Sequence, residues 1–211
     1  MNKRFLLILV GIVLAFGAYF FFTNDNGEQT GNSQTAASNH VYGKADSKVT
    51  VVEYGDFECP ACAAYVPIVQ QIKANYEDKI AFQFRHFPLV QIHQNAMAAS
   101  RAAEAASKQG KFWEMHDLLY GQQDAWAKSP NAASIFEDYA TQLSLSIDQF
   151  KADMAAQSTL DTINADVREG QKLNVTGTPT FVINGQKVEQ TPQTYEAFAA
   201  LIDAALKEQG Q

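Results

Sequence analysis

EYGDFECPACAAYVP, residues 53–67, contains both cysteines of this 211-residue chain, Cys59 and Cys62. A run of β-branched residues at 49–52 leads into this segment, and a helical-looking segment follows it. A strand that delivers a Cys-x-x-Cys pair to the start of a helix is typical of redox proteins. The unpaired N–H groups and the macrodipole at a helix N-terminus favour negative charge, so they lower the pKa of Cys59. The thiolate is the form that attacks.

Two structural alternatives for the cysteine pair are weaker than redox chemistry. A disulfide between residues three apart closes a very small loop and stabilises a fold by only roughly 2 kcal/mol, and a chain of this length has little need of it. Structural zinc usually takes four ligands, of which two cysteines supply half. The histidines are scattered and show no ligand spacing: His40, His86, His93 and His116. We therefore name no metal ligand and no cofactor beyond a redox-active disulfide.

Several residues at fixed distances from the cysteines match a known pattern. Residues 57–62 read Phe-Glu-Cys-Pro-Ala-Cys, Glu53 lies six positions before the first cysteine, and Pro67 lies eight after it. Far downstream, residues 177–181 read Gly-Thr-Pro-Thr-Phe. Together these positions resemble the thioredoxin superfamily. The proline directly after the first cysteine makes the DsbA-like branch the nearest match, and the resemblance runs from about residue 40 to the C-terminus.

The resemblance implies an α/β thioredoxin fold with a helical insertion at about residues 91–174. The sequence is consistent with this fold, because Lys48–Tyr54 and Ile80–Phe87 alternate like strands around a helix that contains Pro67. Strand, helix and strand in this order imply a parallel pair of strands. After the insertion we expect a strand at Thr180–Ile183, a two-residue turn at Asn184-Gly185, a strand at Lys187–Glu189 and a closing helix over residues 195–206.

The resemblance also assigns roles to residues around the cysteines. Cys59 and Cys62 are the expected redox pair, with Pro60 and Ala61 as the dipeptide between them. Glu53 continues a strand with apolar residues on both faces, so burial raises its pKa, and the resemblance gives it proton exchange with Cys62.

Farther along the chain, the resemblance implies a cis peptide bond at Thr178-Pro179. This bond would lie against the cysteines, leaving the backbone of Thr178 free to pair with an extended substrate. An ordinary trans turn is the alternative. By contrast, Asp56 and Glu58 are expected to be solvated acids, and His86, His93 and His116 to have structural or surface roles.

Within the insertion, two local patterns predict helix starts. Ser129-Pro130 resembles an N-cap followed by proline at the first helical position. Ser146 with Gln149 fits a capping box. A further helix is expected around Leu160, Ile163 and Val167.

The N-terminal region predicts export. Residues 1–4 carry the positive charges of a cytoplasmic stub, and residues 5–22 form an unbroken apolar run long enough for a transmembrane helix. We favour an uncleaved, single-pass membrane anchor over a cleaved signal sequence, with the remainder on the extracytoplasmic side. Residues 23–46 form a flexible linker, and residues 47–211 form the folded domain.

The net charge of the part predicted to be exported limits the classes of partner that it can bind. Without its two N-terminal basic residues the chain keeps 14 basic against 23 acidic residues, a net charge near −9. A strongly acidic domain is a poor match for the phosphate backbone, so nucleic acid is not expected as a partner. Thiols of exported proteins are the expected substrates. A DsbB-like membrane redox partner is implied only by analogy.

Three functions fit these features. The preferred one is an extracytoplasmic oxidase that forms disulfides in exported proteins by thiol–disulfide exchange through Cys59 and Cys62. A disulfide reductase or isomerase on the same fold is the second. The third is a carrier of Cu(I) or another soft metal, held by the two thiolates.

Overall fold

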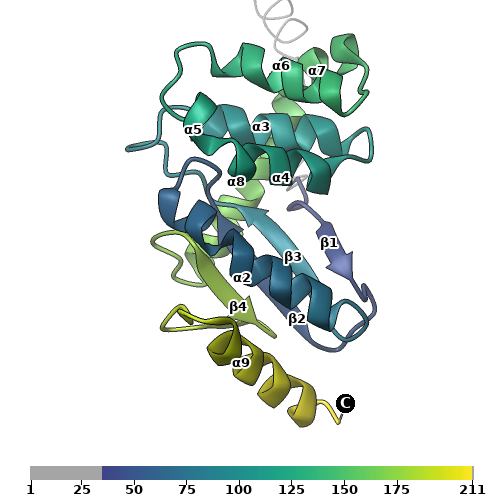
Figure 1. Cartoon of the computed structure of the whole chain (residues 1–211), viewed down its shortest axis with the longest axis vertical. Helices are drawn as coiled ribbons and strands as arrows, with labels where there is room; N and C mark the ends of the chain where they lie inside the picture. Colours follow the sequence, from purple (N-terminus) through teal and green to yellow (C-terminus); the bar gives the residue numbers. More distant parts are fainter. Residues whose placement is uncertain (1–34, 211) are drawn as a thin grey trace, which may run out of the picture. The chain divides into compact units, whose positions relative to one another are not determined.

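A computed structural model describes residues 35–210 (Figure 1). The predicted cytoplasmic stub, the predicted anchor and the first half of the predicted linker lie outside the described residues. In the second half of that linker, residues 40–43 form a strand of the sheet. In the part of the chain that the structure describes, we find no helix long and apolar enough to cross a membrane.

A five-stranded sheet of order β1-β3-β2-β4-β5 forms the centre of residues 35–210. Strands β2 and β3 are parallel, as the sequence predicts, and the other neighbouring pairs are antiparallel. The bounds are β1 (His40–Gly43), β2 (Thr50–Gly55), β3 (Ala81–His86), β4 (Thr180–Ile183) and β5 (Gln186–Lys187).

The β4–β5 hairpin follows the sequence prediction except at its end. Its turn is Asn184-Gly185, with φ of 48° and 79° as a type I′ turn requires. Strand β5 spans Gln186–Lys187, so it is shorter than the predicted strand and begins one residue earlier.

Helices cover both faces of the sheet. Helices α2 (Pro60–Tyr76) and α9 (Tyr195–Glu208) pack on one face, where Val51, Phe82 and Phe181 belong to the same apolar cluster as both helices. Helix α8 (Gln157–Lys172) lies against the sheet near β3, and Gly170 approaches the ring of Tyr54 so closely that a Cβ would lie 2.9 Å from it. The strands therefore lie between two helical layers, as their double-sided apolar pattern predicts.

The predicted helical insertion is present between β3 and β4 and contains six helices. In Figure 1, α3 to α7 gather at one end of the sheet. Its core brings together the small residues of α3 and the aromatic residues of the other helices. The bounds are α3 (Ala96–Ser107), α4 (Phe112–Gly121), α5 (Gln123–Trp126), α6 (Ala132–Gln142), α7 (Ile147–Ala155) and α8.

One predicted helix start in the insertion, at Ser129-Pro130, is wrong, and the other, at Ser146, is right but lacks the predicted capping box. Helix α6 begins at Ala132, because the Ser129 hydroxyl accepts the N–H of Asn131 at 3.1 Å and forms a turn ahead of the helix. Ser146 is the N-cap of α7, yet its side chain makes no capping hydrogen bond. Its backbone is instead held by the side chain of Gln109, at 2.9 and 3.2 Å.

Candidate active site at the Cys59–Cys62 pair

The cysteine pair lies where β2 passes into α2. The backbone carbonyl oxygen of Asp56 accepts the N–H of Cys59 at 3.0 Å, which turns the chain. Pro60 is the first residue of the helix, a position where its missing N–H costs nothing. Cys59 is the N-cap residue. Both cysteines are free thiols, with 7% of Cys59 and 1% of Cys62 exposed.

The surroundings of Cys59 strongly favour its thiolate. Hydrogen bonding from the Cys62 side chain lowers the pKa of Cys59 most, and the whole environment brings it to about 5 despite partial burial. The Thr178 side chain and the backbone N–H groups of Cys62 and Ala61 add to this effect. The N–H contribution is the one expected for a cysteine at a helix N-terminus.

Cys62 has the opposite environment. Burial raises its pKa far above that of a free thiol, and the hydrogen bond that Cys62 gives to Cys59 raises it further. The two sulfurs therefore differ as expected for a thiol–disulfide exchange pair. Cys59 is ionised and nearer the surface, and Cys62 is protonated and enclosed.

Glu53 is buried, as predicted, with 3% of its surface exposed. It lies on β2 between Phe84 of β3 and Phe181 of β4. Burial raises the pKa of Glu53 to about 8, and the charge of Lys73 opposes that shift. A carboxyl group with this pKa can both give and take a proton near neutral pH.

The Thr178-Pro179 peptide bond is cis, and the loop lies against the cysteines. Sγ of Cys59 lies 3.5 Å from the carbonyl oxygen of Thr178. The structure therefore brings Glu53, both cysteines and the downstream loop to one site. The roles of these residues in exchange remain predictions.

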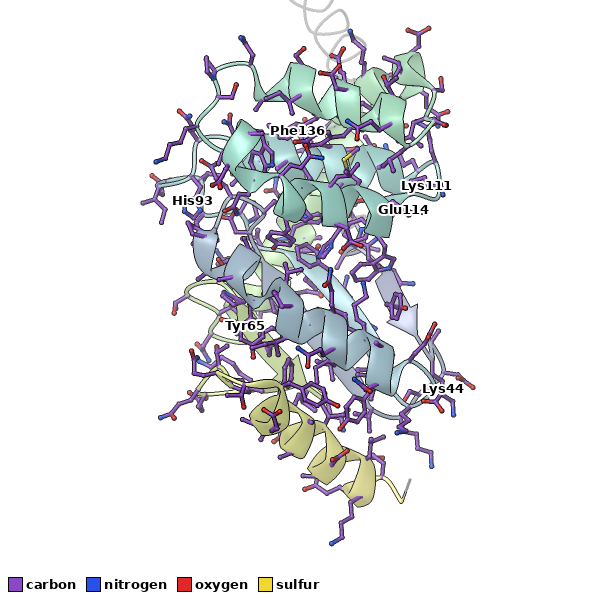
Figure 2. The ribbon with its side chains drawn as sticks, in the orientation of Figure 1. Lys44, Tyr65, His93, Lys111, Glu114 and Phe136 are labelled. Atoms are coloured by element: carbon purple, nitrogen blue, oxygen red, sulfur yellow. The ribbon has the colours of Figure 1, made fainter. Side chains whose placement is uncertain are left out.

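Asp56 and Glu58 are not solvated, so that prediction is wrong. The carboxylate of Asp56 is fully buried and accepts the N–H groups of Glu58 and Leu89, each at 2.8 Å, and Nδ1 of His93 at 2.7 Å. Glu58 accepts the N–H of Asn95 at 2.6 Å. Both acids hold the loop before α3 against the cysteine motif, and Figure 2 shows His93 beside the start of α2.

Two further residues reach the site from the insertion, and sequence reasoning missed both. The amide of Gln123 donates to the carbonyl oxygens of Phe57 at 2.7 Å and Cys59 at 3.1 Å. The hydroxyl of Tyr120 is buried, and burial together with the nearby Cys62 raises its pKa well above the ordinary value. Neither residue has a local sequence signal, because the insertion carries both to the cysteines.

The whole fold matches a known family. The family described as Thioredoxin matches residues 35–204. The chain belongs to the thioredoxin family. A thioredoxin-like oxidoreductase from Silicibacter pomeroyi is 28% identical, with a TM-score of 0.68 over 80% of this chain and 92% of that one. These matches confirm the predicted superfamily and enzyme class, a thiol–disulfide oxidoreductase.

More distant structures support the DsbA-like architecture. Oxidised BdbD from Bacillus subtilis is 23% identical, with a TM-score of 0.70 over 83% of this chain and all of that one. An α-DsbA1 from Wolbachia pipientis is 21% identical, with a TM-score of 0.69 over 80% of this chain and 90% of that one. At these identities the likeness concerns the fold.

Curated relatives add a different context. The Na(+)/H(+) antiporter NhaA 3 of Salinispora tropica is 40% identical over 166 residues, which are 79% of this chain and 24% of that protein. The antiporter NhaA 1 of Salinispora arenicola is 39% identical over the same shares. The chain thus spans about a quarter of the length of the curated relatives it matches.

Proposed function

We propose that this protein is an extracytoplasmic oxidase that introduces disulfides into exported proteins. The observation that carries the proposal is the pair of opposed thiol environments, with Cys59 at a pKa of about 5 and Cys62 buried. A stabilised thiolate favours the reduced state of the pair, so the disulfide is a strong oxidant.

The size of this effect can be approximated. At pH 7, a Cys59 pKa of about 5 stabilises the thiolate by about 2.7 kcal/mol. For a two-electron couple, that free energy raises the reduction potential by about 60 mV. This contribution alone moves a pair with a thioredoxin-like potential a substantial part of the way toward the range of strong oxidants.

Exchange begins on the oxidised protein. A substrate thiolate attacks Sγ of Cys59, the Cys59–Cys62 bond breaks, and Cys62 leaves as a thiolate. Because burial disfavours that charge, Cys62 takes a proton, which Glu53 can supply while its pKa is about 8. A mixed disulfide between Cys59 and the substrate remains.

A second substrate thiolate completes the transfer. It attacks the substrate sulfur of the mixed disulfide, forms the substrate disulfide and releases Cys59 as a thiolate. The enzyme now holds the two electrons that the substrate lost. A DsbB-like membrane partner, proposed by analogy, would accept these electrons, and Glu53 would take the proton back from Cys62.

Substrate binding is proposed at the loop that faces Cys59. The carbonyl of Thr178 lies 3.5 Å from Sγ of Cys59. An extended peptide that pairs with the backbone of Thr178 would therefore bring its own sulfur close to Sγ of Cys59. The apolar run at residues 5–22 supports a membrane anchor that keeps this site on the extracytoplasmic side.

A redox titration of the full chain in glutathione buffers tests the direction. We expect a reduction potential above about −180 mV, between those of protein disulfide isomerase and DsbA. A potential near the thioredoxin value of about −270 mV would favour the reductase. Oxidation of a reduced, unfolded substrate must accompany the high potential. If the protein instead shows no disulfide exchange and binds Cu(I) through both thiolates, the metal carrier is favoured.

A further inference from the structure

A second cluster of chemically active side chains lies away from the cysteine motif. It consists of His40 on β1, His86 on β3 and Glu104 on α3. One nitrogen from each imidazole and one carboxylate oxygen lie within 4.8 Å of one another, and all three residues are buried. The sequence separates these residues widely, which is why spacing gave no sign of the cluster.

The Nε2 atoms of both imidazoles face the same carboxylate oxygen of Glu104. Nε2 of His86 lies 2.8 Å from Oε1 of Glu104, and Nε2 of His40 makes a shorter contact with that same oxygen. Ligand atoms around a tetrahedral zinc ion lie about 3.3 Å apart. Displacements below about 1 Å would therefore open this cluster to an ion of that size.

Aromatic packing fixes the two rings in this orientation. His40 stacks on Phe112 with ring centroids 3.5 Å apart and planes 6° from parallel. His86 packs edge-on against Phe84 and Phe112. Rings held in place before an ion arrives lose little freedom on binding, which favours affinity.

The charge balance of the cluster points the same way. Among residues 35–210, the ion-pair partners of Glu104 are these two histidines, with no lysine or arginine beside them. A buried carboxylate needs compensating charge, which these two imidazoles supply only when they are protonated, whereas a neutral imidazole supplies only a dipole. A divalent cation supplies the charge and accepts the nitrogen lone pairs.

We propose that His40, His86 and Glu104 bind a divalent transition-metal ion of the zinc type. Two imidazoles and one carboxylate form a donor set that zinc takes when a fourth position is left to water. About 7% of the His40 side chain and 9% of the Glu104 side chain are exposed, so the cluster lies close to solvent. The ion joins β1 to β3 and to α3.

The test measures zinc binding to the full chain in which both cysteines are replaced, Cys59→Ser and Cys62→Ser, so that thiolates cannot contribute. After removal of metal with a chelator and dialysis against Zn²⁺, elemental analysis is expected to find one ion per chain. Loading with Co²⁺ is expected to give the visible absorption of a tetrahedral site. Chains that retain no zinc above a buffer control overturn the proposal.

Variants locate the ion. His86→Gln and Glu104→Gln are each expected to weaken zinc binding by roughly 100-fold, at least as much as losing a residue that merely orients a ligand. His93→Gln is the matched control, because His93 is also hydrogen-bonded to a carboxylate but lies outside the cluster. Equal affinity in the cluster variants and the control overturns the proposal.

Folding defects are handled by a third variant and a second readout. His40→Gln changes an edge strand, and its fold is checked by circular dichroism. Zinc is expected to raise the melting temperature of the parent chain by mass action and to leave His40→Gln unchanged. A zinc-dependent rise of the same size in His40→Gln contradicts the assignment. Disulfide exchange is measured separately on chains with intact cysteines, so failure of this site leaves the proposed oxidase unaffected.

Discussion

The side chain of Gln123 donates a hydrogen bond to the backbone carbonyl of Cys59 at 3.1 Å. The same amide also donates to the carbonyl of Phe57 at 2.7 Å, so one residue of the helical insertion holds two carbonyl groups at the start of the motif. The insertion thus does more than cover the sheet, because it positions the backbone that carries the attacking sulfur.

Replacing Gln123 with leucine tests this contact. The change leaves two buried carbonyl oxygens without that donor, so we expect a loss of about 1–3 kcal/mol in the free energy of unfolding. We also expect a shift in the Cys59 pKa, because the N-cap backbone is freed. Urea unfolding and thiolate absorbance measure the two effects. Gln122→Leu is the matched control, since Gln122 is exposed. Equal losses in the two variants contradict the assignment.

Removing the buried carboxyl with Glu53→Gln alters the pH dependence of stability. The folded pKa of about 8 lies above the unfolded value, so the native state holds the extra proton between about pH 4.5 and 8. Wild-type Glu53 therefore costs stability progressively as pH rises through that range. The variant lacks this cost, and its advantage over wild type should grow to at most about 5 kcal/mol by pH 8.

Unfolding of both proteins in the reduced state, at a series of pH values, checks this expectation. The difference between the two chains isolates Glu53, because Cys59 titrates equally in each. A stability difference that stays constant from pH 5 to pH 8 rules out a buried, proton-holding Glu53.

Local sequence was sufficient for the parts of the site that lie within one strand–helix unit. The apolar residues on both faces of the strand predicted the burial of Glu53, and the position of Cys59 at the start of a helix predicted its lowered pKa. The hairpin turn at Asn184-Gly185 is equally local, because those residue types accept positive φ.

Contacts between segments far apart in the sequence could not be predicted from local sequence patterns. Asp56 looked like a solvated acid because nothing near it in sequence reveals Leu89 and His93, whose donors lie 33 and 37 residues away. Glu104 sits in an alanine-rich helix and meets His40 across 64 residues. The tertiary fold creates these partners, and short motifs do not encode them.

Changing Thr178 to valine tests whether its side chain stabilises the thiolate. The hydroxyl of Thr178 is buried and has no hydrogen-bond partner among the described residues, so it is free to donate to the Cys59 thiolate and lower the pKa of Cys59. Valine keeps the shape and removes the oxygen, so the Cys59 pKa should rise from about 5, by up to about one unit, and the reduction potential should fall by up to about 30 mV. Thr191→Val, in a nearby loop, provides a control. An unchanged pKa in Thr178→Val contradicts this role.

Single cysteine variants should separate the two sulfurs. In Cys62→Ser, the low-pKa Cys59 can attack a substrate disulfide, but no neighbouring thiol remains to release the product. Mixed disulfides should therefore accumulate on non-reducing gels. In Cys59→Ser, the remaining sulfur is 1% exposed and has a strongly raised pKa, so trapping should be weaker by at least tenfold. Dithiothreitol should release every trapped species. Equal trapping by both variants would mean that the environments of the two sulfurs do not decide which one attacks.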